Sequence, residues 1–185
     1  HLVLDQDLAP GTYRPLKPEE LEQLERLSLT DKHMKLQKSL DAFLFCCYAG
    51  MRYSDFTNLS KKNIVDINQE TWLIYKSVKT GTEVRLPLYL LFAGKGIVIL
   101  NKYRNNLEDF FRLRDNSNIN KDLIIIAKLA GLSKKISFHT ARHTNATLLI
   151  YNGVNITTVQ KLLGHKSVKT TQVYTNIMDM TIVHD

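Results

Sequence analysis

Two side chains that could take part in chemistry lie close together in the segment Leu162–Thr175, LLGHKSVKTTQVYT. Gly164 stands where a glycine commonly ends a helix, which places His165 in the turn that follows. Ser167 belongs to the residue types that cap helices, and Tyr174 comes about two turns further on. A histidine fixed in a turn and a tyrosine on the next helix can face one pocket. Taken alone, the pair fits equally well a helix-turn-helix whose tyrosine is half-buried.

A second group of candidate residues comes from the sequence HTARH. At helical spacing, His139, Arg142 and His143 share one face of a helix. Two histidines at this spacing also occur in zinc metalloproteases, but Thr140 stands where that motif needs a glutamate as general base. An arginine between the two histidines would also repel the metal ion. The group therefore favours an anionic oxygen over zinc as its ligand.

Two further cationic side chains stand at predicted turns. Arg52, in AGMRYSD, precedes a short predicted helix over 54–59 that Ser54 is expected to cap; the ordinary alternative is a surface arginine paired with Asp55. Lys79 falls at the tip of a predicted β-hairpin. A lysine in an exposed turn is commonly a solvated charge, although a flexible hairpin can also bring it over a bound ligand.

The elements that must position these residues form a mainly α-helical fold with a small three-stranded antiparallel β-sheet. Turn-forming residues separate β-prone runs and predict strands over 63–67, 71–77 and 83–88. Apolar periodicity predicts helices that start at Pro18 and that cover about 34–49, 97–114, 121–130 and 139–151, with a polar loop over 115–120. A further helix ends at Leu163 and is expected to be capped by Asn155 or Thr157.

The composition indicates a globular domain with an anionic partner. Lysine and arginine outnumber aspartate and glutamate by 25 to 18, which gives a net charge of +7 and a pI near 9.4. No apolar run approaches the length of a membrane span, so no membrane partner is expected. Cys46 and Cys47 are adjacent, seldom form a disulfide in that arrangement, and are expected to be reduced core residues of a cytoplasmic protein.

Four sequence blocks resemble, in their order and spacing, the tyrosine recombinase (phage integrase) family: AGMRYSD, KTGTEVRLPL, HTARHTNAT and LGHKSVKTTQVYT. Each block alone is a weak signal, whereas all four in order are specific. The resemblance implies the catalytic-domain fold of that family and six catalytic residues, with the tyrosine as nucleophile: Arg52, Lys79, His139, Arg142, His165 and Tyr174. Asp55 falls at the family's common acidic position and, with His143, is expected to support the site. Ala141 replaces the leucine of many relatives at a position that packs rather than reacts.

The function that this resemblance implies is site-specific DNA recombination or integration. DNA strands would be cleaved and rejoined through a 3′-phosphotyrosyl intermediate, without a metal, ATP or another cofactor. The HTARHT block is most similar to integrases of conjugative transposons and related mobile elements. The alternatives are a type IB topoisomerase-like enzyme and a catalytically idle DNA-binding module of the same fold.

The resemblance also implies how the chain is divided and what it contacts. Residues 1–12 are expected to be a linker remnant from a missing N-terminal DNA-binding region, residues 13–174 the catalytic domain and residues 175–185 a C-terminal tail. The expected partners are double-stranded DNA, other protomers in a tetramer on DNA, and accessory DNA-bending proteins. The expected location is the bacterial cytoplasm, in association with the nucleoid. An apolar tail would suit docking on a neighbouring protomer, and its residues are Ile177, Met178, Met180, Ile182 and Val183.

Overall fold

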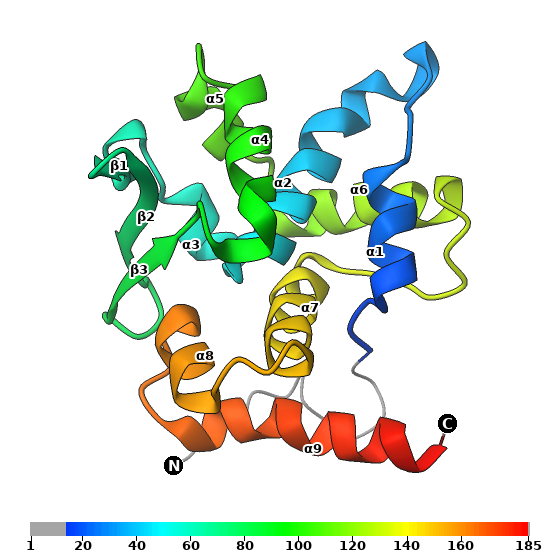
Figure 1. The fold of residues 1–185 in the computed structure, drawn as a ribbon. Helices are drawn as coiled ribbons and strands as arrows, with labels where there is room; N and C mark the ends of the chain where they lie inside the picture. Colours follow the sequence, from blue (N-terminus) through cyan, green and yellow to red (C-terminus); the bar gives the residue numbers. More distant parts are fainter. Residues whose placement is uncertain (1–13, 185) are drawn as a thin grey trace.

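The computed structural model describes residues 14–184, with side chains described as far as Asn176. The chain folds into a mainly helical body with a small β-sheet at one side, as the sequence predicts (Figure 1). The helices are α1 (Pro18–Glu25), α2 (Gln37–Ala49), α3 (Tyr53–Thr57), α4 (Lys95–Lys102), α5 (Leu107–Phe111), α6 (Asn116–Leu129), α7 (Phe138–Tyr151), α8 (Ile156–Leu163) and α9 (Val168–His184). Short 3-10 turns are η2 (Asp31–Leu36), η3 (Lys61–Asn63) and η4 (Leu91–Gly94).

The sheet is antiparallel, with strand order β1-β2-β3 and strands β1 (Ile64–Ile67), β2 (Glu70–Lys76) and β3 (Glu83–Pro87). Buried residues alternate with half-buried ones on β2 and with exposed ones on β3, so that Leu73 and Leu86, paired across the strands, are both buried. The predicted three-stranded sheet is therefore confirmed. Its β2–β3 hairpin extends away from the helical body toward α8 (Figure 1).

Helix α2 forms the centre of the helical body. Every residue from Ser39 to Ala49 is buried, and α7 packs along it. The Asn145 side chain on α7 donates a hydrogen bond of 3.0 Å to the Cys47 carbonyl oxygen and so fixes the two helices against each other. Helix α2 ends at Gly50, whose φ of +67° is a left-handed conformation that glycine adopts without strain.

The predicted single helix over 97–114 is wrong, because the chain forms the separate helices α4 and α5 there. Tyr103 ends the first one, and the side chain of Asn106 caps the second by accepting a hydrogen bond from the Asp109 amide (3.3 Å). The break folds the two helices so that the rings of Tyr103 and Phe110 stack, with centroids 4.0 Å apart. This stacking contact is a tertiary preference that apolar periodicity alone does not reveal.

The predicted polar loop over 115–120 is also wrong, since α6 begins at Asn116. Asp115 is its N-cap, and its carboxylate accepts a hydrogen bond of 3.0 Å from the Asn118 amide. Polar residues here form the exposed first turn of a helix. For α8, Asn155 is the cap among the two expected candidates, accepting from the Thr157 amide at 2.9 Å.

Helix α9 lies across the end of α7 and beside α8 (Figure 1). Ser167 is placed as predicted at its start, with its hydroxyl oxygen accepting from the Lys169 amide at 3.3 Å. The helix continues through Tyr174 to His184, and the side chains of the apolar tail lie outside the described residues, as does the expected linker over 1–12. Within residues 14–184, no helix is long and apolar enough to cross a membrane.

Candidate active site

Arg142 forms the buried centre of the candidate site. It lies on α7 and is only 1% exposed. Its Nη1 donates to the Gly50 carbonyl oxygen at 2.7 Å and its Nη2 to the Leu163 carbonyl oxygen at 2.8 Å. These carbonyls stand at the C-terminal ends of α2 and α8, where the helix dipole favours a cation. The arginine thereby joins three helices while its charge is compensated inside the protein.

The charge of Arg142 persists at neutral pH. Burial, and then repulsion from Arg52, lowers the pKa of Arg142 to about 10. A value of that size still leaves the guanidinium protonated in the cell. The effect of Arg52 on this pKa also indicates that the two guanidinium groups share one electropositive region.

Arg52 occupies the opening of α3. It is the N-cap residue, so the predicted cap Ser54 instead lies inside the first turn and makes no capping bond. The Arg52 side chain is 14% exposed, and its Nη1 lies 3.7 Å from Oδ2 of Asp55. The same buried Nη1 has no hydrogen-bond partner among the described residues. A buried donor without a partner is costly, and an anionic ligand would satisfy it.

A second buried polar atom in the same region lacks a hydrogen-bond partner among the described residues. It is the hydroxyl of Tyr75 on β2, whose pKa is raised by burial and then by the negative charge of Asp55, and lowered by the charges of Arg142 and Arg52. Nη1 of Arg52 and the Tyr75 hydroxyl both lack a hydrogen-bond partner close to the charges of Arg52 and Arg142. This region is therefore suited to bind a polar, negatively charged group.

Asp55 connects the arginine side of the site to the hairpin. Its carboxylate, 2% exposed, accepts hydrogen bonds from the Val78 amide (2.8 Å) and from the Ser77 hydroxyl (3.4 Å). Both donors lie just after β2, where the hairpin turns. Asp55 therefore orients Arg52 and the start of the hairpin turn together, which fits its expected supporting role.

Tyr174 lies in the same chain and the same site as the arginines. Its side chain is 4% exposed, and its Oη is 2.9 Å from Nδ1 of His143 on α7. The ring of His139 stands edge-on to that of His143, with centroids 4.2 Å apart. The ring of His165 lies parallel to that of Tyr174, at a centroid distance of 6.5 Å. The three histidine rings therefore form one cluster with Tyr174.

The structure places Nδ1 of His143 against the phenol oxygen. Sequence analysis had assigned His143 only a supporting role. The helical spacing of the two histidines puts both on one face of α7, and the crossing of α7 and α9 brings His143 to the tyrosine.

His165 is fixed in the turn between α8 and α9. Its backbone amide donates to the Gln160 carbonyl oxygen (3.0 Å), and its own carbonyl accepts from the Gln160 side chain (3.1 Å). Its Nδ1 lies 2.9 Å from the hydroxyl of Thr171. Burial, and then the charge of Arg142, lowers the pKa of His165 to about 3, so the ring is neutral at neutral pH.

Thr171 is a site residue that the sequence analysis did not identify. It is fully buried and lies three residues before Tyr174, so that both side chains project from one face of α9. That spacing was the available signal. The contact with His165 makes Thr171 the residue that orients this ring relative to the tyrosine.

Lys79 lies at the rim of the site. It is exposed, at the tip of the β2–β3 hairpin, and its charge is among those that lower the pKa of His165. The neighbouring Thr80 hydroxyl donates to the Gly164 carbonyl oxygen at 3.2 Å, which holds the hairpin tip against the turn that carries His165. Lys76, by contrast, is paired in register with Glu83 at the end of β2.

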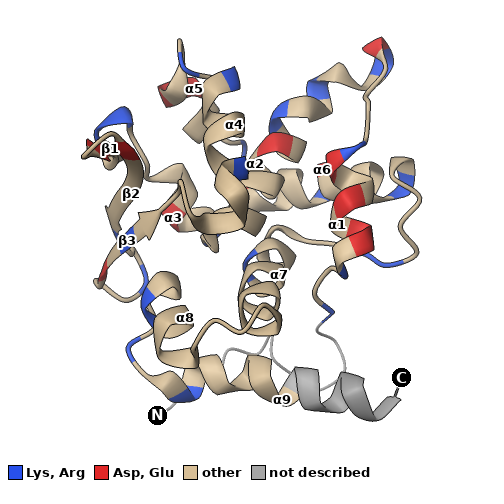
Figure 2. Cartoon of the chain, in the orientation of Figure 1, with Lys and Arg blue, Asp and Glu red and all other residues tan. Residues whose placement is uncertain are grey.

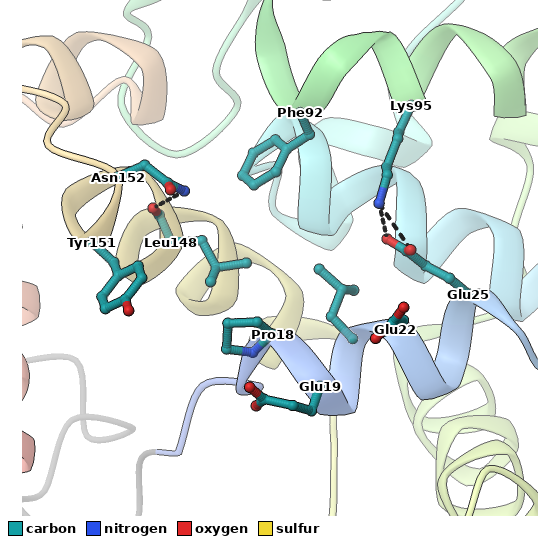
Figure 3. A pocket seen from close by; sticks show the side chains of 10 residues that line it. Pro18, Glu19, Glu22, Glu25, Phe92, Lys95, Leu148, Tyr151 and Asn152 are labelled. Carbon is teal, nitrogen blue, oxygen red and sulfur yellow. Dashed lines mark hydrogen bonds and ion pairs between the residues drawn. The ribbon is translucent and has the colours of Figure 1, made fainter.

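The pocket shown in Figure 3 lies elsewhere, between α1, the η4–α4 segment and the end of α7. An ion pair between Lys95 and Glu25, at 2.8 Å, borders it. None of the predicted site residues lines this pocket. The candidate chemistry therefore belongs to the cluster around Arg142, and the described residues contain no group of three or more metal-ligating side chains.

Known proteins resemble this chain over most of its length. The phage integrase family matches residues 14–180. Tyrosine recombinase XerD of Bifidobacterium longum is 50% identical over 171 residues, which cover 83% of this chain and 54% of the relative. A tyrosine recombinase of Pseudothermotoga lettingae is 31% identical over 169 residues, which cover 89% of this chain and 56% of the relative.

Solved structures share the fold. A post-cleavage complex of the XerH site-specific recombinase bound to its palindromic difH substrate matches with a TM-score of 0.69 and 21% identity, over 91% of this chain and 51% of that one. The integrase of transposon Tn1549, in complex with a circular intermediate DNA, matches with a TM-score of 0.64 and 18% identity, over 92% of this chain and 63% of that one. The chain spans about half the length of the curated relatives it matches.

Proposed function

The chain belongs to the phage integrase family of tyrosine recombinases, and we propose on this basis that it cleaves and rejoins DNA strands at specific sites. The nucleophile is Tyr174, and the product of cleavage is a 3′-phosphotyrosyl enzyme with a free 5′ hydroxyl. The observation that supports this most directly is that buried Arg142, with the half-buried Arg52 near it, lies close enough to the Tyr174 phenol of the same chain to interact with its charge. The buried Nη1 of Arg52, which has no hydrogen-bond partner among the described residues, would bind a phosphate oxygen.

The arginines and histidines would stabilise the charge that develops during attack. A phosphodiester repels an incoming nucleophile because its non-bridging oxygens are negative, and two guanidinium groups offset that charge. Neutral His165 adds a hydrogen bond: when the Thr171 hydroxyl donates to Nδ1, the ring proton stays on Nε2 and can be donated to a phosphate oxygen. His139 would contribute in the same way from its half-buried position.

Lys79 is the proposed general acid. As the bond between phosphorus and the 5′ oxygen breaks, that oxygen needs a proton, and an ammonium group on the hairpin tip can supply it. The bond energy of the phosphodiester is kept in the tyrosyl linkage, so a second 5′ hydroxyl can attack and release the tyrosine without ATP.

Double-stranded DNA is the proposed partner. Exposed lysines follow the side of the molecule formed by the hairpin tip, α8 and the start of α9, whereas acidic residues gather on α1 (Figure 2). The lysines of that side are Lys79, Lys161, Lys166 and Lys169. Such a basic rim around a phosphate site suits the DNA backbone and makes binding weaken as salt increases.

The wider organisation is proposed from the relatives. Lambda integrase has been solved as a dimer on a core site and as a tetramer on a Holliday junction. We extend this to the present chain as a tetramer on DNA, with residues 13–174 as the catalytic domain, 175–185 as the tail that contacts a neighbouring protomer, and 1–12 as a linker. Accessory DNA-bending proteins, a transposon-type element as the source, and a place at the bacterial nucleoid belong to the same proposal.

The test is covalent trapping on a nicked duplex of random sequence, at low salt and with saturation verified by fluorescence anisotropy. In such a substrate the short strand that carries the freed 5′ hydroxyl diffuses away, so the enzyme stays attached. We expect a denaturant-stable adduct whose peptide map places the nucleotide on Tyr174, and no adduct with Tyr174→Phe. Saturated complexes without an adduct would instead establish an idle DNA-binding module. An adduct that persists in Tyr174→Phe, or a failure to bind DNA at low salt, would equally overturn the proposal.

A further inference from the structure

His143 is in direct contact with the atom that would attack DNA. Its Nδ1 is 2.9 Å from the Tyr174 hydroxyl oxygen, within ordinary hydrogen-bond distance. The histidine is 3% exposed and the tyrosine 4%, so little water competes for this bond. A buried hydrogen bond of this kind restricts the phenol to one orientation.

The packing of α7 against α9 fixes the contact between His143 and Tyr174. His143 follows Arg142 directly, and Arg142 is fixed by its two bonds to helix-terminal carbonyls. Helix α9 packs against α7 along this stretch, and the rings of His143 and Tyr174 are tilted by 56° with centroids 5.5 Å apart. The position of the phenol is therefore set by the same short segment that sets the position of the arginine.

The geometry leaves His139 in a different place. Its ring meets the edge of the His143 ring at a centroid distance of 4.2 Å, and it is only half-buried. His139 therefore packs against the ring whose Nδ1 contacts the phenol oxygen. Nδ1 of His143 lies within hydrogen-bond distance of the phenol and is placed to receive its proton.

We propose that His143 is a catalytic residue that aims the phenol of Tyr174 and receives its proton during attack. The proposal rests on the proposed function and deepens it. The O–H bond of Tyr174 breaks, its proton goes to Nδ1, and the phenol oxygen forms the bond to phosphorus. The bond from phosphorus to the 5′ oxygen breaks, and that oxygen takes its proton from Lys79. To accept this proton at Nδ1, the neutral ring of His143 must be the tautomer that carries its own proton on Nε2.

Side-chain shape gives a matched set of variants. The amide of asparagine reaches about the position of a histidine Nδ1, whereas that of glutamine reaches about the position of Nε2. Asparagine can therefore keep a hydrogen bond to the phenol but cannot take its proton, and phenylalanine can do neither. His143→Asn, His143→Gln and His143→Phe thus separate aiming from proton transfer, with His139→Asn as the rival proton acceptor.

The kinetic test measures single-turnover adduct formation on the saturated nicked duplex, with ordinary DNA and with a 5′ bridging sulfur. We expect His143→Phe and His143→Gln to slow cleavage by about 10²–10⁴-fold. His143→Asn should lie between these variants and the unaltered chain. None should recover on the sulfur substrate, because the sulfur repairs the leaving group and not the nucleophile. A rate for His143→Phe within about threefold of the unaltered chain, or recovery on sulfur, would overturn the proposal.

A second readout does not depend on cleavage. In the chain labelled with ¹³C at tyrosine Cζ, the Tyr174 resonance is identified by its loss in Tyr174→Phe. We expect its chemical shift to move in His143→Phe and to be largely kept in His139→Asn, in proteins whose circular dichroism and thermal unfolding show a native fold. If the unaltered chain forms no adduct but this shift pattern holds, the proposed function fails while the contact stands. If His139→Asn moves the resonance and His143→Asn and His143→Phe do not, the assignment to His143 is wrong.

Discussion

Arg142 and Lys79 carry two of the positive charges on which the proposed reaction depends, and they lie in opposite surroundings. Arg142 is buried and held by carbonyls at the ends of α2 and α8. Lys79 is exposed at the tip of a hairpin whose contact with the helical body includes the bond from Thr80 to Gly164. One cation is part of the core, and the other is brought to the site by a surface element.

The difference shows at which residue a substitution can change the rate of cleavage without changing the stability of the fold. At Arg142 the bonds that orient the guanidinium for a phosphate also join α2, α7 and α8, so a substitution affects stability and rate together. At the hairpin tip a side chain can be removed without opening the core. The arginine side thus provides fixed electrostatic stabilisation, and the hairpin provides a cation whose position the fold constrains less.

The largest expected effect on cleavage and stability comes from a substitution of the buried Arg142. Arg142→Ala should reduce cleavage by about 10³–10⁵-fold, the size of effect seen for arginines that stabilise phosphoryl transfer. It should also lower the free energy of unfolding by about 3 kcal/mol, because each buried acceptor left without a donor costs about 1–3 kcal/mol. Adduct kinetics and urea unfolding measure the two effects. A variant of native stability would show that the core does not depend on this side chain.

The next effect comes from the hairpin. Lys79→Ala should slow cleavage of ordinary DNA by about 10²–10⁴-fold, with the free energy of unfolding changed by no more than about 0.5 kcal/mol. On a substrate with sulfur at the bridging 5′ position, which leaves without a proton, the rate should recover. Lys76→Ala is the matched control from the same hairpin and should behave like the unaltered chain on both substrates. Recovery in Lys76→Ala in place of Lys79→Ala would move the general acid to Lys76.

Substitutions at two glycines compare the buried region around Arg142 with the hairpin tip without changing any charge. Gly50 and Gly81 have φ of +67° and +68°, so alanine meets a similar backbone cost at either position. A Cβ on Gly50 would lie 2.6 Å from the Asn145 side chain and 2.9 Å from Leu163, whereas on Gly81 its nearest contact is Lys76 at 3.9 Å. Gly50→Ala should therefore lower the free energy of unfolding by about 1–3 kcal/mol more than Gly81→Ala. Equal losses of the free energy of unfolding in urea titrations would mean that the side chains around Gly50 repack easily.

The smallest expected effect is a pH dependence of the free energy of unfolding that arises from the buried His165. Burial and the charge of Arg142 lower the pKa of His165 to about 3, while an unfolded histidine titrates near 6.5. Between these values the unfolded chain binds a proton that the folded chain does not, so stability from this group is full above about pH 6.5 and is lost as the pH falls toward 3. The contribution is at most about 1.4 kcal/mol per pH unit.

Urea unfolding between pH 7 and pH 5 checks this prediction. His165→Trp removes the titrating ring, so its stability should fall less with acid than that of the unaltered chain. Lys79→Ala should keep the slope of the unaltered chain. The same slope in His165→Trp would assign the acid sensitivity to other groups.

Local sequence signals predicted most elements, and each of the two errors has its own physical reason. Gly50 and Gly164 end helices where expected, with left-handed φ values, and the three strands pair as expected. The helix over 97–114 was wrong because apolar periodicity continues across a break that Asn106 caps and that ring stacking stabilises. The polar run after Asp115 was read as a loop because an exposed first turn and a loop have the same composition.

The sequence by itself determined the residue types of the site and the turns and helices that carry them. Arg52, Arg142, His165 and Tyr174 could be selected because their motifs occur in one order and at one spacing. Only the tertiary structure decided how deeply each is buried and which atoms meet. Helical spacing places His139 and His143 on one face of α7, but the distance of 2.9 Å from His143 to Tyr174 depends on how α9 crosses α7. That crossing is set by side-chain packing between segments about 30 residues apart, which local spacing does not encode.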